Sequence, residues 1–354
     1  MMDILKFFLY LILTFFLMGI LIFVHELGHY IAARLCKVPV REFAIGMGKR
    51  LGGFTSKKTG TVYSFRLFPI GGYVAMAGDD DEFDDPNGFN HKSIPQKIFI
   101  LASGAAMNFL TGLLAMLVLT VGMTAGGYRL PSTVIGDFDP GATSYVTGLE
   151  IGDRILSVDG TRVHTGYDLS YEIMFNGNEP VDIVVERNGQ EYLIRDVHFE
   201  STVAEGIELG EMDFYVVAAA PTPANVLKTT LYRSTSSIKM VFDSIGGLIT
   251  GRFSLSSMSG PIGVTSVVSD VAAQPMAGWN ILYLFALIAM NLGVMNLLPI
   301  PALDGGRIFF RIIELLRFGK PIKPEFEAKV HGVGMMLLLL FTAFIAVKDV
   351  FALF

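Results

Sequence analysis

Residues 4–29 read ILKFFLYLILTFFLMGILIFVHELGH, an apolar run that ends in two histidines and a glutamate. About 20 apolar residues in a helix cross the hydrocarbon core of a bilayer, so this run is long enough to span one. Its last residues, His25-Glu26-Leu27-Gly28-His29, place three ionisable side chains at the end of the span. Because such residues are costly inside a membrane and are usually functional there, this end of the helix is the first candidate site.

Three further stretches are long and almost free of charge. They are residues 98–128, 271–303 and 332–354. The chain has 354 residues, of which 52% are hydrophobic and 17% charged, and its mean hydropathy is +0.52. We therefore predict four transmembrane helices. A cleaved signal peptide is the alternative for the first run, but no Ala-x-Ala cleavage site follows it.

Charge and cysteine content exclude other classes of protein. The net charge is -6 and no Lys/Arg-rich tract occurs, so we expect no nucleic-acid partner. The single cysteine, Cys36, excludes an internal disulfide and a multi-cysteine metal site.

The loops differ in charge, which predicts their sides of the membrane. Residues 34–66 hold eight Lys/Arg and one acid, and residues 307–329 add six basic residues, so both segments are expected in the cytoplasm. Residues 126–274 hold nine basic and nineteen acidic residues and are expected outside. An even number of spans then places both termini outside and the candidate site near the cytoplasmic face.

The outer loop divides into two parts. Alternating strand-like segments with Gly, Asp-Gly and Asn-Gly turns predict a β-rich domain at residues 129–205, and PGATSYVTGLEIGDRILSVDGTRV (residues 140–163) resembles a PDZ domain of the kind found on bacterial proteases. Residues 206–270 are expected to be an amphipathic and linker region with a helix over residues 222–255. The membrane-embedded parts are then residues 1–128 and 271–354.

The cytoplasmic loop of the first part contains TVYSFRLFPIGGYVAMAG (residues 61–78), in which apolar and polar residues alternate. Lys57-Lys58-Thr59-Gly60 is a candidate hairpin turn, and Gly71-Gly72 is a candidate kink. Since strands at membrane depth are tolerated only where protein covers their backbone, we expect a covered β-hairpin on the cytoplasmic side.

The motif HExxH on a helix has a direct chemical meaning. His25 and His29 lie on one face, so both imidazoles reach a single zinc ion, while Glu26 lies beside it to take a proton from a bound water. Such a water becomes a hydroxide suited to attack an amide carbonyl. The spacing therefore predicts a hydrolase site, and a packing role for these three side chains is the simpler alternative.

A catalytic zinc needs a third protein ligand, and Asp304 is the best candidate. It follows the third span in NLLPIPALDGG (residues 296–306), where Pro299 and Pro301 interrupt the helix and the glycines allow a tight turn. The alternative is that Asp304 ends a helix and pairs with Arg307 in the headgroup region; residues alone leave both open.

These motifs together resemble the site-2 protease family, and the RseP-like branch of regulated intramembrane proteases most closely. The resemblance rests on HELGH in the first span, GGYVAMAG in the cytoplasmic loop, one PDZ-like domain, SGPIG (residues 259–263) and NLLPIPALDGG, in that order along essentially the whole chain. It implies zinc as cofactor, His25, His29 and Asp304 as ligands and Glu26 as general base.

Substrate-binding residues follow from the same resemblance. Asn296 matches an asparagine of the family that handles substrate. The alternation around Gly72, Tyr73 and Val74 favours binding of an unwound substrate as an added strand. Asn108 stands in GAAMNF, where the family usually has Gly-Pro before the asparagine. Ala105 departs from that pattern, so Asn108 is expected to be a packing or polar-gate residue.

The resemblance implies an intramembrane zinc endopeptidase in the bacterial cell membrane that cuts single-span proteins such as anti-sigma factors or signal-peptide remnants. Its partners are those substrates and the lipid bilayer. A transporter or channel that uses the His, Glu and Asp cluster as an ion path is the alternative, although no inverted repeats are evident. A PDZ-bearing scaffold without catalysis is a third, weaker one, because nothing departs from HExxH.

Overall fold

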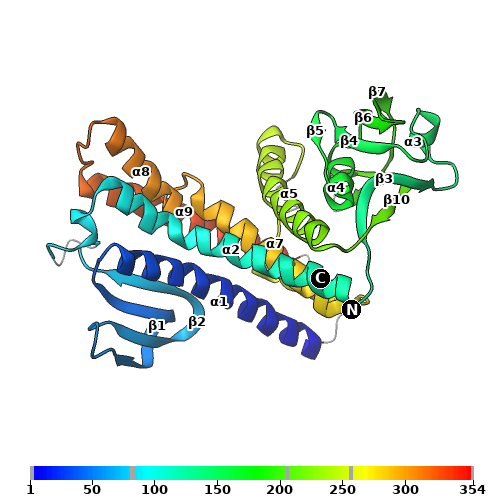
Figure 1. Ribbon diagram of the computed structural model, residues 1–354. Helices are drawn as coiled ribbons and strands as arrows, with labels where there is room; N and C mark the ends of the chain where they lie inside the picture. The colour runs from blue at the N-terminus through cyan, green and yellow to red at the C-terminus, as the bar shows by residue number, and fades with distance from the viewer. Residues whose placement is uncertain (1–3, 80–84, 205–206, 255–257, 352–354) are drawn as a thin grey trace. The chain divides into compact units, whose positions relative to one another are not determined.

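The computed structural model describes residues 4–79, 85–204, 207–254 and 258–351. The chain forms two compact units, residues 1–112 with 259–354, and residues 113–258. The helices of the first unit (Figure 1) are α1 (Ile4–Leu35), η1 (Phe89–His91), the first part of α2 (Ile94–Ala125), α6 (Pro261–Ala273), α7 (Ala277–Leu297), α8 (Asp304–Leu316) and α9 (Pro324–Phe351).

Four of the described helices are long and apolar enough to cross a membrane. They are α1, α2, α7 and α9. The prediction of four apolar helices is confirmed, and α7 ends where Pro299 was expected to interrupt it, but two starting points were wrong. The third span begins at Ala277 and not at residue 271. Gln274 ends α6 in an extended conformation before Pro275, Met276 has a left-handed φ of 64°, and α7 then ends before Pro299. The last helix also begins at Pro324, two turns before the predicted residue 332.

A β-hairpin joins α1 to η1 in the first unit. It consists of β1 (Val40–Thr55) and β2 (Val62–Met76), which pair antiparallel around the predicted turn, where Gly60 has a φ of 71°. Both strands bend, and two parts of β2 pair with the same part of β1. Phe43 of β1 therefore pairs with Tyr63 on one side and with Val74 on the other. Residues 72–76 therefore form an edge of this sheet, whose described partners are all in the first half of β1. Gly71, with a φ of 88°, makes the predicted kink.

Two helices and the hairpin share a small core at the end of α1. Its buried residues are Ala32, Ala33, Val38, Val40, Met76, Phe89, Ile100 and Leu101. Gly28 of α1 sets how closely α2 approaches, because a Cβ there would lie 2.3 Å from the backbone oxygen of Ser103. The glycine of HELGH is thus needed for helix packing, and it brings the two histidines against α2.

The second unit is built on a β-sheet with strand order β10-β3-β4-β6-β7, to which β5 adds beside β4. The strands are β3 (Leu130–Phe138), β4 (Arg154–Val158), β5 (Thr161–Arg162), β6 (Val181–Arg187), β7 (Gln190–Val197) and β10 (Phe214–Ala219), and β8 (Glu200–Ala204) pairs with β9 (Ile207–Glu211). A buried cluster that includes Ile155, Leu169, Ile183 and Phe214 forms its core. The region predicted to be β-rich, residues 129–205, does consist largely of strands.

Besides the last part of α2, the described residues of the second unit form α3 (Thr143–Val146), α4 (Gly166–Asn176) and α5 (Pro223–Thr250). The amphipathic helix predicted over residues 222–255 is α5, and Thr222 caps it by accepting a hydrogen bond from the backbone N–H of Asn225 at 3.2 Å. The sheet continues past residue 205, because β10 lies in the segment expected to be a linker and pairs with β3. Local sequence patterns do not predict such pairing between distant segments.

Candidate metal centre and active site

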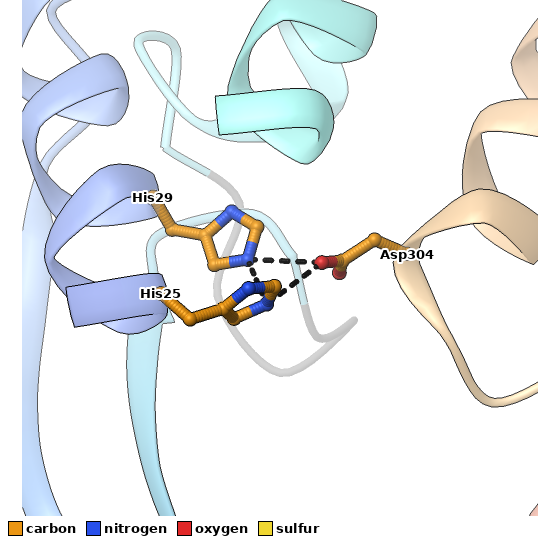
Figure 2. A group of neighbouring side chains, drawn as sticks. All are labelled: His25, His29 and Asp304. Carbon is orange, nitrogen blue, oxygen red and sulfur yellow. Dashed lines mark hydrogen bonds and ion pairs between the residues drawn. The ribbon is translucent and has the colours of Figure 1, made fainter. Parts of the chain in front are cut away.

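His25, His29 and Asp304 come together in the first unit, as Figure 2 shows. The Nε2 atoms of His25 and His29 lie 3.1 Å apart, and Oδ2 of Asp304 lies 3.0 Å from the first and 3.1 Å from the second. The two histidines are only 8% and 7% exposed. Three potential metal ligands thus converge on one buried point from two segments that are 275 residues apart along the chain.

The hydrogen bond behind His29 identifies the atom that faces this point. Nδ1 of His29 lies 2.9 Å from the backbone oxygen of Ile100, which can only accept, so Nδ1 carries the proton. Nε2 of the neutral imidazole then presents a lone pair toward a carboxylate oxygen and a second imidazole. Ligands about 2.0–2.1 Å from a tetrahedral zinc ion are about 3.3–3.4 Å apart, close to the distances found here. The donor set and its spacing therefore fit zinc.

Asp304 reaches the histidines through a compact turn between α7 and α8. Ala302 in this turn has a left-handed φ of 80°, and its backbone N–H donates to Nδ1 of His331 at 2.9 Å. A Cβ on Gly305 or Gly306 would lie 2.1 Å and 2.4 Å, respectively, from backbone oxygens of the same turn. The two glycines after Asp304 are therefore required by close backbone packing.

Arg307 does not take Asp304 as its ion-pair partner. Its guanidinium binds the carboxylate of Asp79, with Nη1 donating to Oδ2 at 3.3 Å. It also lies over the ring of Phe89, 5.4 Å from the centroid. The carboxylate of Asp304 is thus left to the two histidines, which favours the metal-ligand interpretation over the headgroup ion pair.

Glu26 is half-buried beside the histidines and contacts the hairpin. The backbone N–H of Val74 donates a hydrogen bond to its carboxylate. A Cβ on Gly72 would lie 3.3 Å from Cγ of Glu26, so the strand passes directly against this side chain. The hairpin edge and the candidate general base therefore form one structure.

A polar network fixes the side chain of Tyr73 within the hairpin. The carboxylate of Glu42 accepts hydrogen bonds from Tyr73 Oη at 2.6 Å, Ser64 Oγ at 2.5 Å and Arg66 Nη2 at 2.8 Å. Burial raises the pKa of Tyr73 to about 12, and the hydrogen bond to Glu42 adds to the effect. Burial alone would raise the pKa of Glu42, but its hydrogen bonds outweigh burial and lower it.

The two predicted asparagines occupy different places. Asn296 is half-buried in the last turn of α7, and no hydrogen bond among the described residues joins it to His25, His29 or Asp304. Asn108 is fully buried, with Nδ2 3.2 Å from Nδ1 of His25. The structure thus brings Asn108 to the candidate metal ligands, whereas none of its described hydrogen bonds links Asn296 to them.

Three residues that contact or support this site were not predicted from the sequence. Ile100 acts through its backbone, Gly104 lies against both imidazoles, and Glu42 holds the hairpin network together. Gly104 does stand four residues before Asn108, so a shared helix face was the available signal for it. A backbone acceptor carries no side-chain signal at all.

Comparison with known proteins identifies the family. The model of peptidase family M50 matches residues 13–341 of the chain. A protein of Fusobacterium nucleatum subsp. nucleatum named "Putative zinc metalloprotease" is 37% identical over 96% of this chain and 97% of its own length. The zinc metalloprotease RasP of Geobacillus kaustophilus is 29% identical over 94% and 95%, respectively.

A further relative has a more specific name. The regulator of sigma-W protease RasP of Bacillus subtilis is 29% identical over 95% of this chain and 97% of its own length. Both the family match and the Fusobacterium relative extend over nearly the full length. The resemblance to site-2 proteases is confirmed at the level of the family, and the chain belongs to peptidase family M50.

Proposed function

We propose that this protein is an intramembrane zinc endopeptidase whose ligands are His25, His29 and Asp304. The observation that carries the proposal is the convergence of two Nε2 atoms and one carboxylate oxygen within 3.0–3.1 Å of one another. Family membership and the names of the relatives support the same chemistry. A bound zinc ion would supply Lewis acidity and lower the pKa of a coordinated water to about 7.

Glu26 is the general base of the proposed reaction. Its carboxylate takes the proton of the attacking water and passes it to the amide nitrogen that leaves when the peptide bond breaks. The hydrogen bond from the Val74 N–H keeps the carboxylate beside the histidines. Burial of this point excludes bulk water, which strengthens each electrostatic contact within it.

The substrate binds as an added strand along the edge formed by residues 72–76. A helical peptide hides its carbonyls in internal hydrogen bonds, so it must unwind before its amide can be attacked. Gly72, Tyr73 and Val74 offer backbone groups that replace the lost bonds. Since the Val74 N–H is taken by Glu26, pairing uses the carbonyl of Val74 and its neighbours. Asn296 is proposed to hydrogen-bond the extended peptide.

The proposed substrates are single-span membrane proteins, such as anti-sigma factors or signal-peptide remnants. Support comes from the relative named regulator of sigma-W protease and from the resemblance to the RseP-like branch with a single PDZ domain. The proposed location is the bacterial cell membrane, with both termini and the β-rich domain outside and the active site near the cytoplasmic face. The charge difference between the loops supports this orientation.

The β-rich domain at residues 129–205 is proposed to be PDZ-like and to exclude substrates whose outer domain is still intact. Residues 206–270 then connect it to the membrane-embedded parts, residues 1–128 and 271–354. The strand β10 suggests one refinement, because it adds residues 214–219 to the same sheet. A filter of this kind changes which proteins are cut and leaves the chemistry unchanged.

The test uses the purified chain and its Glu26→Gln form with a panel of tagged single-span proteins. Cut sites are mapped by mass spectrometry, and bound zinc is measured for both forms. We expect the wild type to cleave at defined positions, and Glu26→Gln to keep zinc while turnover falls at least about 100-fold. Equal cleavage by both forms, or a wild type that binds no zinc, would overturn the proposal. Ion flux without peptide products would instead favour a transporter.

A further inference from the structure

One face of α2 lies behind both histidines of the candidate metal centre. Ile100, Gly104 and Asn108 are spaced four residues apart, so they follow one another along this face. The backbone oxygen of Ile100 accepts from Nδ1 of His29 at 2.9 Å, and the amide of Asn108 lies 3.2 Å from Nδ1 of His25. Each imidazole therefore has one partner on α2, in register with the spacing of HExxH.

Gly104 lies between these two partners and gives the imidazoles their space. A Cβ at this position would lie 2.4 Å from Nε2 of His29 and 2.7 Å from Nε2 of His25. Any other residue would displace the very atoms that face Asp304. The close approach of α1 and α2 at Gly28 has the same consequence, since it presses the imidazoles onto this face.

The orientation of the Asn108 amide decides which ring nitrogen of His25 carries the proton and which presents a lone pair. The Oδ1 atom is buried and has no hydrogen-bond partner among the described residues, so only His25 fixes which end of the amide faces it. The two ends have nearly the same shape and exchange by a half-turn. With Oδ1 toward His25, Nδ1 carries a proton and donates it, and Nε2 presents its lone pair toward Asp304.

We propose that Ile100 and Asn108 are positioning residues that set the same tautomer on both histidines, so that two Nε2 lone pairs face one zinc ion. The proposal rests on the proposed function and deepens it. Metal-ligating histidines commonly donate their other N–H to an acceptor that fixes the ring, and the loss of such a partner weakens metal affinity about 10–100-fold. Here one acceptor is a backbone carbonyl and the other is a buried amide.

The test measures metal affinity in the full-length protein in detergent. Zinc dissociation constants are obtained by chelator competition, and Co²⁺ absorption reports the ligand geometry. Asn108→Leu removes the acceptor at similar size, and we expect zinc affinity to fall about 10–100-fold with an altered Co²⁺ spectrum. Asn108→Asp restores an acceptor and should stay within about threefold of the wild type. Gly104→Ala should lose zinc, because its Cβ would collide with both Nε2 atoms.

Thr120→Val is the matched control, since Thr120 is a buried polar residue of α2 and, among the described residues, its hydroxyl bonds only the backbone oxygen of Met116 in the same helix. Thermal unfolding of each metal-free variant checks the fold, and Asn108→Ala replaces Asn108→Leu if the latter does not fold. If Asn108→Leu, or Asn108→Ala in its place, binds zinc as tightly as the wild type, the inference is overturned. The same holds if that variant and Asn108→Asp lose equal zinc affinity. A wild type that binds no zinc would instead overturn the proposed function.

Discussion

Gly72 of the hairpin lies directly against Glu26 of α1, and a side chain at position 72 would occupy space that Glu26 and the backbone of Ala44 already fill. A Cβ there would lie 3.3 Å from Cγ of Glu26 and 2.8 Å from the backbone oxygen of Ala44. The strand that is proposed to hold the substrate thus touches the residue that is proposed to move its proton. Several consequences of this contact are measurable.

Gly72→Val should reduce kcat/KM at least about 100-fold, because a displacement of about 1 Å at a reacting group costs that much. Zinc content should stay at the wild-type level, since position 72 does not contact the candidate ligands. Gly52→Val is the matched control in the same hairpin, because no atom of the described residues lies within 4 Å of a Cβ on Gly52. Peptide cleavage assays with zinc determination on both variants check the prediction, and equal activity would contradict it.

Val74→Pro removes the N–H that donates to Glu26 and should abolish cleavage while zinc stays bound. Tyr73→Pro should do the same by breaking the edge strand. The expected loss is about 10²–10⁴-fold, the range for a misplaced general base. Leu51→Pro, at an exposed position on the opposite part of the hairpin, should be tolerated far better. Cleavage by Val74→Pro at the wild-type rate would refute the role of this hydrogen bond.

The Glu42 network should be insensitive to pH across the physiological range. The pKa of Glu42 lies below its ordinary value of 4.5, so its stabilisation is complete above that value and is lost as the pH falls through the lowered pKa. The pKa of Tyr73 is raised from 10.0 to about 12. Its contribution to the free energy of unfolding is therefore complete below pH 10 and is lost as the pH rises to about 12. A tyrosinate absorbance titration of wild type and Tyr73→Phe should differ by one group that ionises near pH 12.

Lys239→Met should destabilise the second unit by roughly 2 kcal/mol, because it leaves a buried carboxylate without its ion-pair partner. Lys239 Nζ lies 3.1 Å from Glu172, which is 2% exposed, and 2.6 Å from Asp243. The exposed Lys228 on the same helix provides the control Lys228→Met. Hydrogen exchange of α4 and α5 in the full chain measures both variants, and equal protection in the two would contradict the prediction.

Removal of Leu130–Ala219 with a short Gly-Ser bridge should widen the range of proteins that are cut and leave zinc content unchanged. These bounds follow the sheet, in which β10 pairs with β3. Removal of residues 133–201 alone splits β3 and leaves β10 without it, so that form should expose apolar strand surface and aggregate. Cleavage of the substrate panel and gel filtration distinguish the two forms. Complete inactivity of the longer deletion would argue against a filter.

The local parts of this protein could be predicted because they depend on short spacings. HExxH places His25 and His29 on one face, and the Lys57–Gly60 turn and Gly71 kink follow from backbone preferences. Asp304 was identified as a candidate because an isolated carboxylate beside an apolar run needs a partner. The sequence left two partners open, and the structure favours the histidines because Arg307 binds Asp79.

The remaining parts depend on contacts between distant segments. Asn108 faces His25 only because Gly28 lets α1 and α2 pack closely, and no spacing within one helix reveals that register. The pairing of β10 with β3 bridges about 80 residues in the same way. The break between α6 and α7 was missed because both helices are apolar, and hydropathy does not detect a change of direction at Gln274-Pro275.

A last contact links α9 to the first turn of α6. The carboxylate of Asp349, near the end of α9, accepts the backbone N–H groups of Gly260 and Gly263 at 2.8 and 2.9 Å, which caps the first turn of α6. Asp349 lies 89 residues after Gly260 along the chain, so this one carboxylate ties the start of α6 to the far end of α9. Helix α6 therefore depends on α9 for two of its first amide partners, and a shift of α9 would free both amides at once.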